Sequence, residues 1–259
     1  MNSIVDEKIL EIEGMVMAFG GLMALTNLNF RVKRGMIKAV IGPNGAGKTT
    51  LFNIITGSFP PTEGSVRFKG QPIQGLQAHK IAGRGISRTF QTVELFDNMT
   101  VLENVMMGCH TRVRPSFMGS GLLLPKSRRK EIQIWERAMK ILKFIGLSHK
   151  SDDYADSLPL GEQKILEIGR ALASEPELVC LDEPAAGLNE TETHLASSLI
   201  KAIRARGITV LLVEHDMKVV MSISDEIVVL NYGQKIAEGT PDAVRNNPRV
   251  VEAYLGSED

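Results

Sequence analysis

A glycine-rich segment combines a flexible backbone with one lysine and one hydroxyl. Residues 42–49 read Gly-Pro-Asn-Gly-Ala-Gly-Lys-Thr and fit the pattern G-x-x-x-x-G-K-S/T. Glycines let successive N–H groups point at phosphate oxygens, and a helix that follows adds its positive end. Lys48 would reach the β- and γ-phosphates, and Thr49 would offer its hydroxyl to Mg²⁺. The segment predicts a nucleoside triphosphate site; an ordinary glycine-rich turn is the alternative. The predicted phosphate-binding residues are Gly42, Pro43, Asn44, Gly45, Ala46, Gly47, Lys48, Thr49 and Thr50.

Two adjacent acids end an apolar run later in the chain. Residues 178–181 read Leu-Val-Cys-Leu and lead into Asp182 and Glu183. Open α/β sheets bind their ligands outside the carboxyl ends of the strands. Asp182 would hold Mg²⁺, directly or through water, and Glu183 would polarise the attacking water. A helix cap or a solvated turn is the alternative for this pair of acids.

The elements that must position these residues follow from the hydrophobic pattern. Strands are predicted at 8–17, 25–32, 36–41 and 65–68, and a helix is predicted from Gly47 to Thr56. Three short β-rich runs, at 178–181, 208–213 and 226–230, alternate with helical stretches. This alternation is typical of an α/β fold with a parallel sheet and crossover helices.

Residues 98–173 have helical patterns in place of the strand-rich patterns on either side and are predicted to form a helical subdomain. Thr100 and Glu103 have the spacing of a capping box, so a helix is expected through Cys109. Residues 110–125 contain several prolines and glycines and are predicted to be a loop insertion, and an amphipathic helix is expected over 127–144. The nucleotide-binding core then comprises residues 1–97 and 174–259. The basic run 126–130 is predicted to be a solvated helix start.

Composition and charge narrow the function classes. Lys plus Arg number 30 and Asp plus Glu number 30, so the net charge is zero, which disfavours a basic nucleic-acid binder. The only cysteines, Cys109 and Cys180, are too few for a disulfide scaffold and too isolated for a zinc site, which favours a reducing, cytoplasmic location. Apolar runs are far shorter than the roughly 20 residues of a membrane-spanning helix.

Four further motifs follow one another in a fixed order. They are Phe-Gln at 90–91, Leu-Pro-Leu-Gly-Glu-Gln at 158–163, Ala-Gly-Leu-Asn at 186–189 and Glu-His-Asp at 214–216. In this order they resemble the Q-loop, signature, D-loop and H-loop of ABC transporter ATPases, over nearly the whole chain. Residues 88–91, 181–189, 213–217, 238–241 and 253–256 are similar to LivG-type ATP-binding subunits of branched-chain amino acid uptake systems. The resemblance implies a P-loop NTPase core with a mixed sheet, an antiparallel β subdomain and a helical subdomain.

The resemblance also implies roles for residues that carry little signal alone. Gln91 would bridge the Mg²⁺ and water region to the membrane-subunit interface, and His215 would bond the γ-phosphate and orient water and Glu183. Phe19 precedes the phosphate loop by 42 − 19 = 23 residues and would stack on adenine; core packing is the alternative, with Phe30 nearby. The implied catalytic residues are Glu183, His215 and Gln91, and the implied metal ligands are Thr49, Gln91 and Asp182.

The signature departs from the family pattern, which usually reads Leu-Ser-Gly-Gly-Gln. In ABC ATPases two nucleotide domains close head to tail, so this motif would face the γ-phosphate of the partner's ATP. Pro159 lacks both a hydroxyl and an amide hydrogen, so at least one usual phosphate contact is lost. We therefore expect two chemically unequal ATP sites; the alternative is that Pro159 only shapes the first turn of a helix. The residues concerned are Leu158, Pro159, Leu160, Gly161 and Glu162.

The function implied by the resemblance is ATP hydrolysis in an ABC importer, for branched-chain amino acids. ATP and Mg²⁺ are the expected ligands. The expected partners are a second ABC ATPase subunit, in a heterodimer or a homodimer, and transmembrane permease subunits at the inner face of the cell membrane. Nucleic acid is not expected. An exporter of lipid or lipopolysaccharide and a non-transport ABC ATPase are the alternatives, and the latter usually needs more chain than 259 residues.

Overall fold

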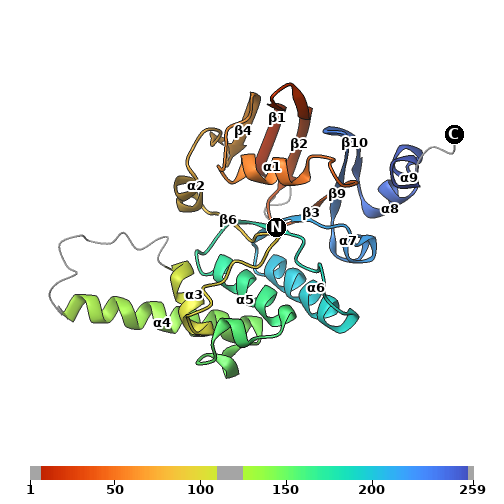
Figure 1. Cartoon of the computed structure of the whole chain (residues 1–259). Coiled ribbons are helices and arrows are strands. Elements are labelled where there is room, and N and C mark those ends of the chain that lie inside the picture. Colours follow the sequence, from red (N-terminus) through yellow and green to blue (C-terminus); the bar gives the residue numbers. More distant parts are fainter. Residues whose placement is uncertain (1–6, 110–124, 256–259) are drawn as a thin grey trace, which may run out of the picture.

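Two sheets organise the protein. The structure is a computed structural model that describes residues 7–109 and 125–255 (Figure 1). The larger sheet has six strands in the order β10-β9-β3-β8-β7-β6, parallel from β9 to β6, with β10 antiparallel to β9. The smaller sheet is antiparallel, in the order β2-β1-β4-β5. The strands are β1 Lys8–Phe19, β2 Leu22–Lys33, β3 Ile37–Ile41, β4 Glu63–Phe68, β5 Gln71–Pro72, β6 Ile86–Arg88, β7 Leu178–Asp182, β8 Thr209–Val213, β9 Glu226–Asn231 and β10 Gln234–Gly239.

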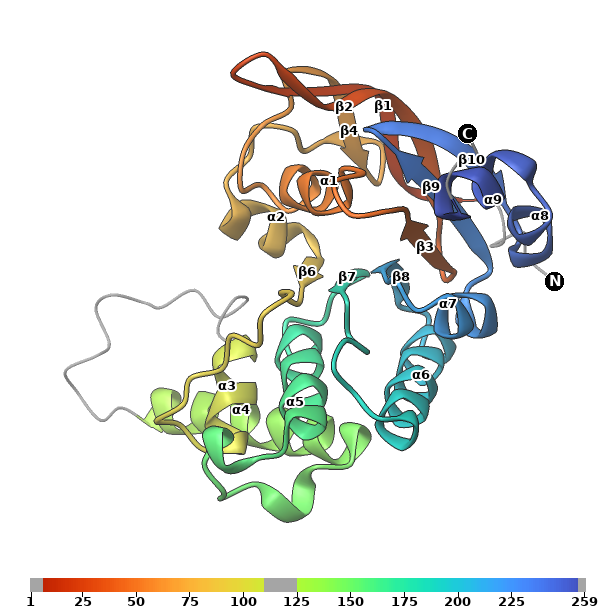
Figure 2. The same cartoon turned by 45° about the vertical axis from the view of Figure 1, so that its right-hand side comes forward.

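Helices cover both faces of the larger sheet. Figure 2 shows α1 between the two sheets, with α5 and α6 below the larger one and α3 and α4 outside α5. The helices are α1 Lys48–Ile55, α2 Ala78–Arg84, α3 Val101–Cys109, α4 Pro125–Ile145, α5 Leu160–Leu172, α6 Glu190–Ala205, α7 Met217–Ile223, α8 Pro241–Arg245 and α9 Pro248–Leu255. The predicted fold class, an α/β core with a mixed sheet and an additional antiparallel sheet, is confirmed.

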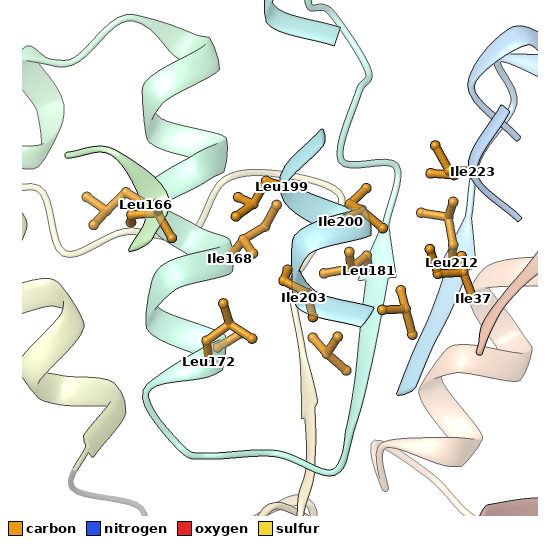
Figure 3. Packing of buried hydrophobic residues seen from close by; sticks show 14 of the residues in the cluster. Ile37, Leu166, Ile168, Leu172, Leu181, Leu199, Ile200, Ile203, Leu212 and Ile223 are labelled. Atoms are coloured by element: carbon orange, nitrogen blue, oxygen red, sulfur yellow. The ribbon is translucent and has the colours of Figure 1, made fainter. Parts of the chain in front are cut away.

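The core lies in two layers because the central strands are buried on both faces. In β3, Ile37 and Ile41 join the helices α5, α6 and α7, whereas Val40 joins α1 and the smaller sheet. This alternation is the period of two expected of a strand. In Figure 3, side chains of α5 and α6 gather around the central strands; those labelled are Ile37, Leu166, Ile168, Leu172, Leu181, Leu199, Ile200, Ile203, Leu212 and Ile223.

The predicted elements agree with the structure to within a few residues. Helix α1 lies inside the predicted range, with Gly47 and Thr56 as its caps. The capping box forms, since the Glu103 amide donates to Thr100 Oγ1 at 3.1 Å and the Thr100 amide donates to Glu103 Oε2 at 2.8 Å. The predicted loop insertion lies outside the described residues up to 124, and Pro125 already begins α4. The division of the chain at residues 98 and 173 stays a prediction.

No helix in the described part of the chain combines the length and the apolarity that crossing a bilayer demands.

Helix α6 offers a matched test of the core. Leu199 is 8% exposed and packs in the core, whereas Leu195, one turn earlier, is 62% exposed. We expect Leu199→Ala to lower the free energy of unfolding by about 2–5 kcal/mol, because a buried side chain is removed and leaves a cavity. Leu195→Ala should change it by less than about 0.5 kcal/mol. Urea unfolding measures both, and equal losses would contradict this packing.

Candidate functional site

Three strand ends meet at one edge of the larger sheet. Val40 of β3 lies opposite Val213 of β8, and Val213 lies opposite Asp182 of β7. The segments that follow these strands are the glycine-rich loop, the acid pair and the stretch that contains His215. Parallel register therefore brings together residues that are more than 100 positions apart in the sequence.

The glycine-rich loop requires glycine at two positions for steric reasons. A Cβ at Gly42 would lie 2.2 Å from the carbonyl oxygen of Leu230, and a Cβ at Gly47 would lie 2.7 Å from that of Ala24. Both backbones have positive φ, 153° and 101°. Gly45, in contrast, faces open space. The loop is thus fixed against its neighbours at Gly42 and Gly47 and open at Gly45, as a phosphate cradle would be.

Lys48 is held by the loop itself. Its Nζ donates to the carbonyl oxygens of Gly42 at 2.6 Å and of Pro43 at 3.1 Å. Burial lowers the pKa of Lys48, and the negative charges of Glu183 and Asp182 oppose that shift. The ammonium therefore lies within the field of both predicted catalytic-site acids. Thr49 is exposed at the first turn of α1, where its hydroxyl is free to meet a ligand.

Glu183 lies at the centre of the predicted catalytic residues. Gln91 Nε2 donates to Glu183 Oε2 at 3.3 Å, and His215 Nδ1 lies 3.7 Å from the same oxygen. The His215 side chain is 59% exposed and that of Glu183 is 18% exposed, so this carboxylate keeps some contact with solvent. The structure thereby brings the three predicted catalytic side chains together.

Asp182 is buried and paired with Arg88, a residue that the sequence analysis did not single out. Arg88 Nη2 donates to Asp182 Oδ2 at 2.8 Å. The Arg88 guanidinium also donates to Asn53 Oδ1 at 2.6 Å and stacks against Phe90, 5.2 Å from the ring centre. Burial raises the pKa of Asp182, and the Arg88 hydrogen bond opposes that shift. Arg88 therefore stabilises the ionised carboxylate that a cation would need.

Phe19 and Phe30 differ sharply in exposure. Phe30 is 4% exposed in the core of the smaller sheet, whereas Phe19 is 46% exposed at the end of β1. The Phe19 ring meets the Phe59 ring edge-on, with the ring centres 5.5 Å apart. Core packing thus accounts for Phe30, and Phe19 keeps a surface on which a base could stack.

The signature residues lie on the helical side of the site and contact the start of α6. Pro159 is the N-cap of α5, so the motif overlaps the first turn of that helix. A Cβ at Gly161 would lie 2.6 Å from Glu192 Oε1, so a larger residue here would require the Glu192 side chain to move. Glu162 forms an ion pair with Lys150, Leu158 is buried and Leu160 is exposed. Two carboxylates, from Glu162 and Glu192, therefore lie near the N-terminus of α5.

Asn189 has a local role that the sequence analysis did not anticipate. Its Oδ1 accepts from the Glu192 amide at 3.0 Å, and Glu192 Oε2 accepts from the Asn189 amide at 3.0 Å. This reciprocal capping box begins α6. The asparagine at this position is thus explained by the helix start, without a partner chain.

The residues around Asp182 suit Mg²⁺ bound together with phosphates. Mg²⁺ prefers oxygen ligands and is commonly held by one or two carboxylates plus substrate phosphates. Asp182, the Thr49 hydroxyl and the Gln91 amide oxygen supply such donors. Within residues 7–109 and 125–255 no group of three or more His, Cys, Asp or Glu could hold a metal ion.

A phosphate loop between a buried strand and a helix, faced by two strand-end acids, defines a P-loop nucleotide-binding core. The sequence profile described as ABC transporter matches residues 25–186, and a profile described as branched-chain amino acid ATP-binding cassette transporter matches residues 234–259. The chain therefore belongs to the ABC transporter family, as an ATP-binding ATPase.

Similar proteins cover nearly the whole length of the chain. It is 47% identical to the high-affinity branched-chain amino acid transport ATP-binding protein BraF of Pseudomonas aeruginosa, over 96% of this chain and 98% of that protein. It is 44% identical to LivG of Escherichia coli, with the same coverage. A crystal structure of a nucleotide-free ATP-binding cassette from an ABC transporter is similar, with a TM-score of 0.84 and 36% identity over 96% of this chain and 100% of that one.

The Arg88–Asp182 pair predicts a characteristic stability cycle. Arg88→Met should lower the free energy of unfolding by about 3–5 kcal/mol, because it leaves a buried carboxylate without its partner. Adding Asp182→Asn should recover most of that loss. Arg137→Met, which removes the exposed pair with Glu175, should cost less than about 1 kcal/mol. Additive losses in the Arg88/Asp182 double variant, measured by urea unfolding, would contradict the pairing.

Phe19 predicts a selective loss of nucleotide affinity. Aromatic stacking on a base contributes about 1–3 kcal/mol, so Phe19→Ala should weaken ATP binding by roughly 5- to 150-fold. Phe19→Trp should retain binding, because it keeps an aromatic face. Titration with ATP measures both variants, and an affinity unchanged in Phe19→Ala would remove Phe19 from the site.

Proposed function

We propose that the chain hydrolyses Mg·ATP to power an importer of branched-chain amino acids. The proposed cargo is based on residues 234–259, which match the branched-chain amino acid transporter profile. BraF and LivG, which are high-affinity branched-chain amino acid transport ATP-binding proteins, support this choice because they are similar to nearly the whole chain. The proposed location is the cytoplasmic face of the cell membrane, where ATP is present and a permease could be contacted.

The hydrolytic step follows from the geometry at Glu183. The Glu183 carboxylate takes a proton from a water molecule as the water oxygen bonds to the γ-phosphorus, and the bond to the β-phosphate oxygen breaks to leave ADP and phosphate. Gln91 and His215, which both approach Glu183 Oε2, orient the water and the carboxylate. Bound Mg²⁺ would neutralise charge on the phosphate oxygens, held by Asp182, Thr49 and Gln91.

Lys48 must exchange partners when ATP binds. Its ammonium now bonds the carbonyl oxygens of Gly42 and Pro43. In the complex it would bond the β- and γ-phosphate oxygens, while the loop amides from Gly45 to Thr49 face the same phosphates. Phosphate oxygens are charged acceptors and make stronger hydrogen bonds than carbonyls do.

We infer that the chain works as one half of a head-to-tail pair of ATPase subunits. A cassette similar to this chain, with a TM-score of 0.74, 26% identity and 90% of this chain covered, has been crystallised as a dimer with ADP and Pi. In such a pair residues 158–162 would meet the partner's ATP, and Pro159 and Glu162 make this contact weaker than a Ser and Gln would. A partner with a different signature, in a heterodimer, would then give two unequal sites.

An apolar groove beside Gln91 is the proposed docking place for a permease segment. It has a volume of about 420 Å³ and lies between α2 and β6 on one side and α3 and α5 on the other. Phe90, Phe96 and Met107 line it and are exposed. Phe90 immediately precedes Gln91, which donates a hydrogen bond to Glu183. An occupant of the groove would therefore contact the segment that positions Glu183.

The cargo is tested by uptake of labelled leucine in cells that lack the encoding gene. We expect uptake to fall, to return with the wild-type gene, and not to return with Lys48→Ala. Unchanged leucine uptake together with lost lipid export would favour an exporter. Co-purification with nucleic acid in place of a membrane fraction would favour a non-transport ATPase.

Glu183→Gln should separate binding from hydrolysis. An amide cannot take the proton of the attacking water, so hydrolysis should fall by about 100-fold or more while ATP stays bound and the dimer persists. Size-exclusion chromatography with ATP and single-turnover hydrolysis measure the two effects. Glu131→Gln, an exposed acid on α4, is the matched control and should behave as wild type. Wild-type hydrolysis by Glu183→Gln would refute the role of this carboxylate.

A further inference from the structure

A buried lysine reaches the backbone of Glu183. Lys164 lies on α5, is 7% exposed, and its Nζ donates to the carbonyl oxygen of Glu183 at 2.9 Å. A lysine is seldom buried without partners, because removing an ammonium group from water is costly. The partner here belongs to the residue that carries the hydrolytic carboxylate, so this contact bears on the site.

The backbone of Glu183 needs such support. Its φ is 49°, in the left-handed region that residues with a side chain rarely adopt. Such a conformation persists where the surroundings determine it, and it is common at functional sites. Three hydrogen bonds hold the peptide groups of Glu183. Its amide donates to the Val213 carbonyl oxygen at 2.9 Å, and its own carbonyl oxygen accepts from Lys164 Nζ at 2.9 Å and from the Ala186 amide at 3.1 Å.

The charges around Lys164 come from the segments that carry the other site residues. Glu214, which is fully buried, accepts hydrogen bonds from the amides of Ala185 at 2.7 Å and His215 at 3.1 Å. Glu167 of α5 accepts from the Phe90 amide at 3.1 Å. Burial lowers the pKa of Lys164, whereas the negative charges of Glu214, Glu167 and Glu183 raise it. The Lys164 ammonium thus lies within the field of carboxylates that accept from the Phe90, Ala185 and His215 amides, and Glu167 also lies 3.9 Å from Arg170 Nη2.

We propose that Lys164 is a positioning residue that fixes the backbone of Glu183 and links the helix beginning at the signature to the hydrolytic carboxylate. This inference rests on the proposed role of Glu183. Helix α5 begins at Leu160, within the motif that would meet the partner's ATP. A shift of α5 on nucleotide binding in one site then moves the Glu183 carbonyl, and with it the carboxylate that serves the other site.

Lys164→Met tests whether Lys164 positions the backbone of Glu183. Methionine keeps the apolar stem of the side chain and removes the ammonium. The complex that the full chain forms in membranes is purified through a tag, and single-turnover hydrolysis and ATP affinity are measured. A misplaced reacting group costs up to about 100-fold in rate, so we expect hydrolysis to fall by about 10- to 100-fold. ATP affinity should stay within about threefold, and Lys164→Arg should restore most of the rate.

Lys38→Met is the matched control for loss of a buried lysine. Lys38 is 1% exposed and its Nζ also donates to a backbone carbonyl oxygen, that of Arg31 at 2.6 Å, but on the side of β3 that faces the smaller sheet. Its loss should lower stability and leave the rate per folded complex unchanged. Where Lys164→Met does not fold, the double variant Lys164→Met/Glu214→Gln removes the unpaired carboxylate as well and carries the same expectations.

The outcomes separate this inference from the function on which it rests. In a Glu183→Gln background Lys164→Met should cause no further loss of hydrolysis, since it acts through Glu183. A wild-type rate in Lys164→Met, an equal loss of rate and ATP affinity, or a failure of Lys164→Arg to restore the rate would overturn the inference while Glu183→Gln remains inactive. Full activity in Glu183→Gln would instead overturn the proposed role of Glu183 itself.

Discussion

The parallel register of β3, β8 and β7 is the constraint on which the site depends. Val40, Val213 and Asp182 lie in one row across these strands, so the chain leaves the sheet three times at the same edge. The phosphate loop, the acid pair and the segment that contains His215 lie at these three strand ends. Because both faces of this sheet are buried, a one-residue slip would move each side chain of a strand into the opposite core layer, where it would have to repack. Packing of the core therefore fixes the positions of the site residues relative to one another.

Charged side chains at this edge have hydrogen-bond partners within the protein. Lys48 bonds loop carbonyls, Asp182 pairs with Arg88, and Glu183 accepts from Gln91. Buried charges are tolerated only with such partners. ATP binding must therefore replace existing hydrogen bonds, and its affinity reflects the difference between two sets of contacts.

The sequence was sufficient for the residues that follow buried strands. Lys48, Asp182 and Glu183 could be placed because each follows a buried strand in a recognisable local pattern. His215 and Gln91 were placed only through the family resemblance. The fold class followed from the same alternation of strands and helices and is confirmed. The assignment of the site residues to ATP and Mg²⁺ stays a prediction, although the structure gathers them.

The residues that sequence reasoning missed are charges buried by tertiary packing. Lys164 and Glu167 lie in a helix where a lysine and a glutamate look like solvent-facing positions, and only the approach of β7 and the Phe90 segment buries them. Arg88 lies in the stretch 88–91 that carries the resemblance, but its pairing with Asp182 depends on tertiary packing and was not foreseen. Asn189, in the motif that resembles the D-loop, begins α6 through its capping box with Glu192, and Gly161 packs against the Glu192 side chain.

A crystal structure of the protein with Mg²⁺ and a non-hydrolysable ATP analogue tests the central claim most directly. The account predicts the triphosphate between the loop at residues 42–49 and Glu183, with Lys48 Nζ moved from the Gly42 carbonyl oxygen onto phosphate oxygens and His215 near the γ-phosphate. Lys48 still bonded to Gly42, with the nucleotide bound elsewhere, would contradict it.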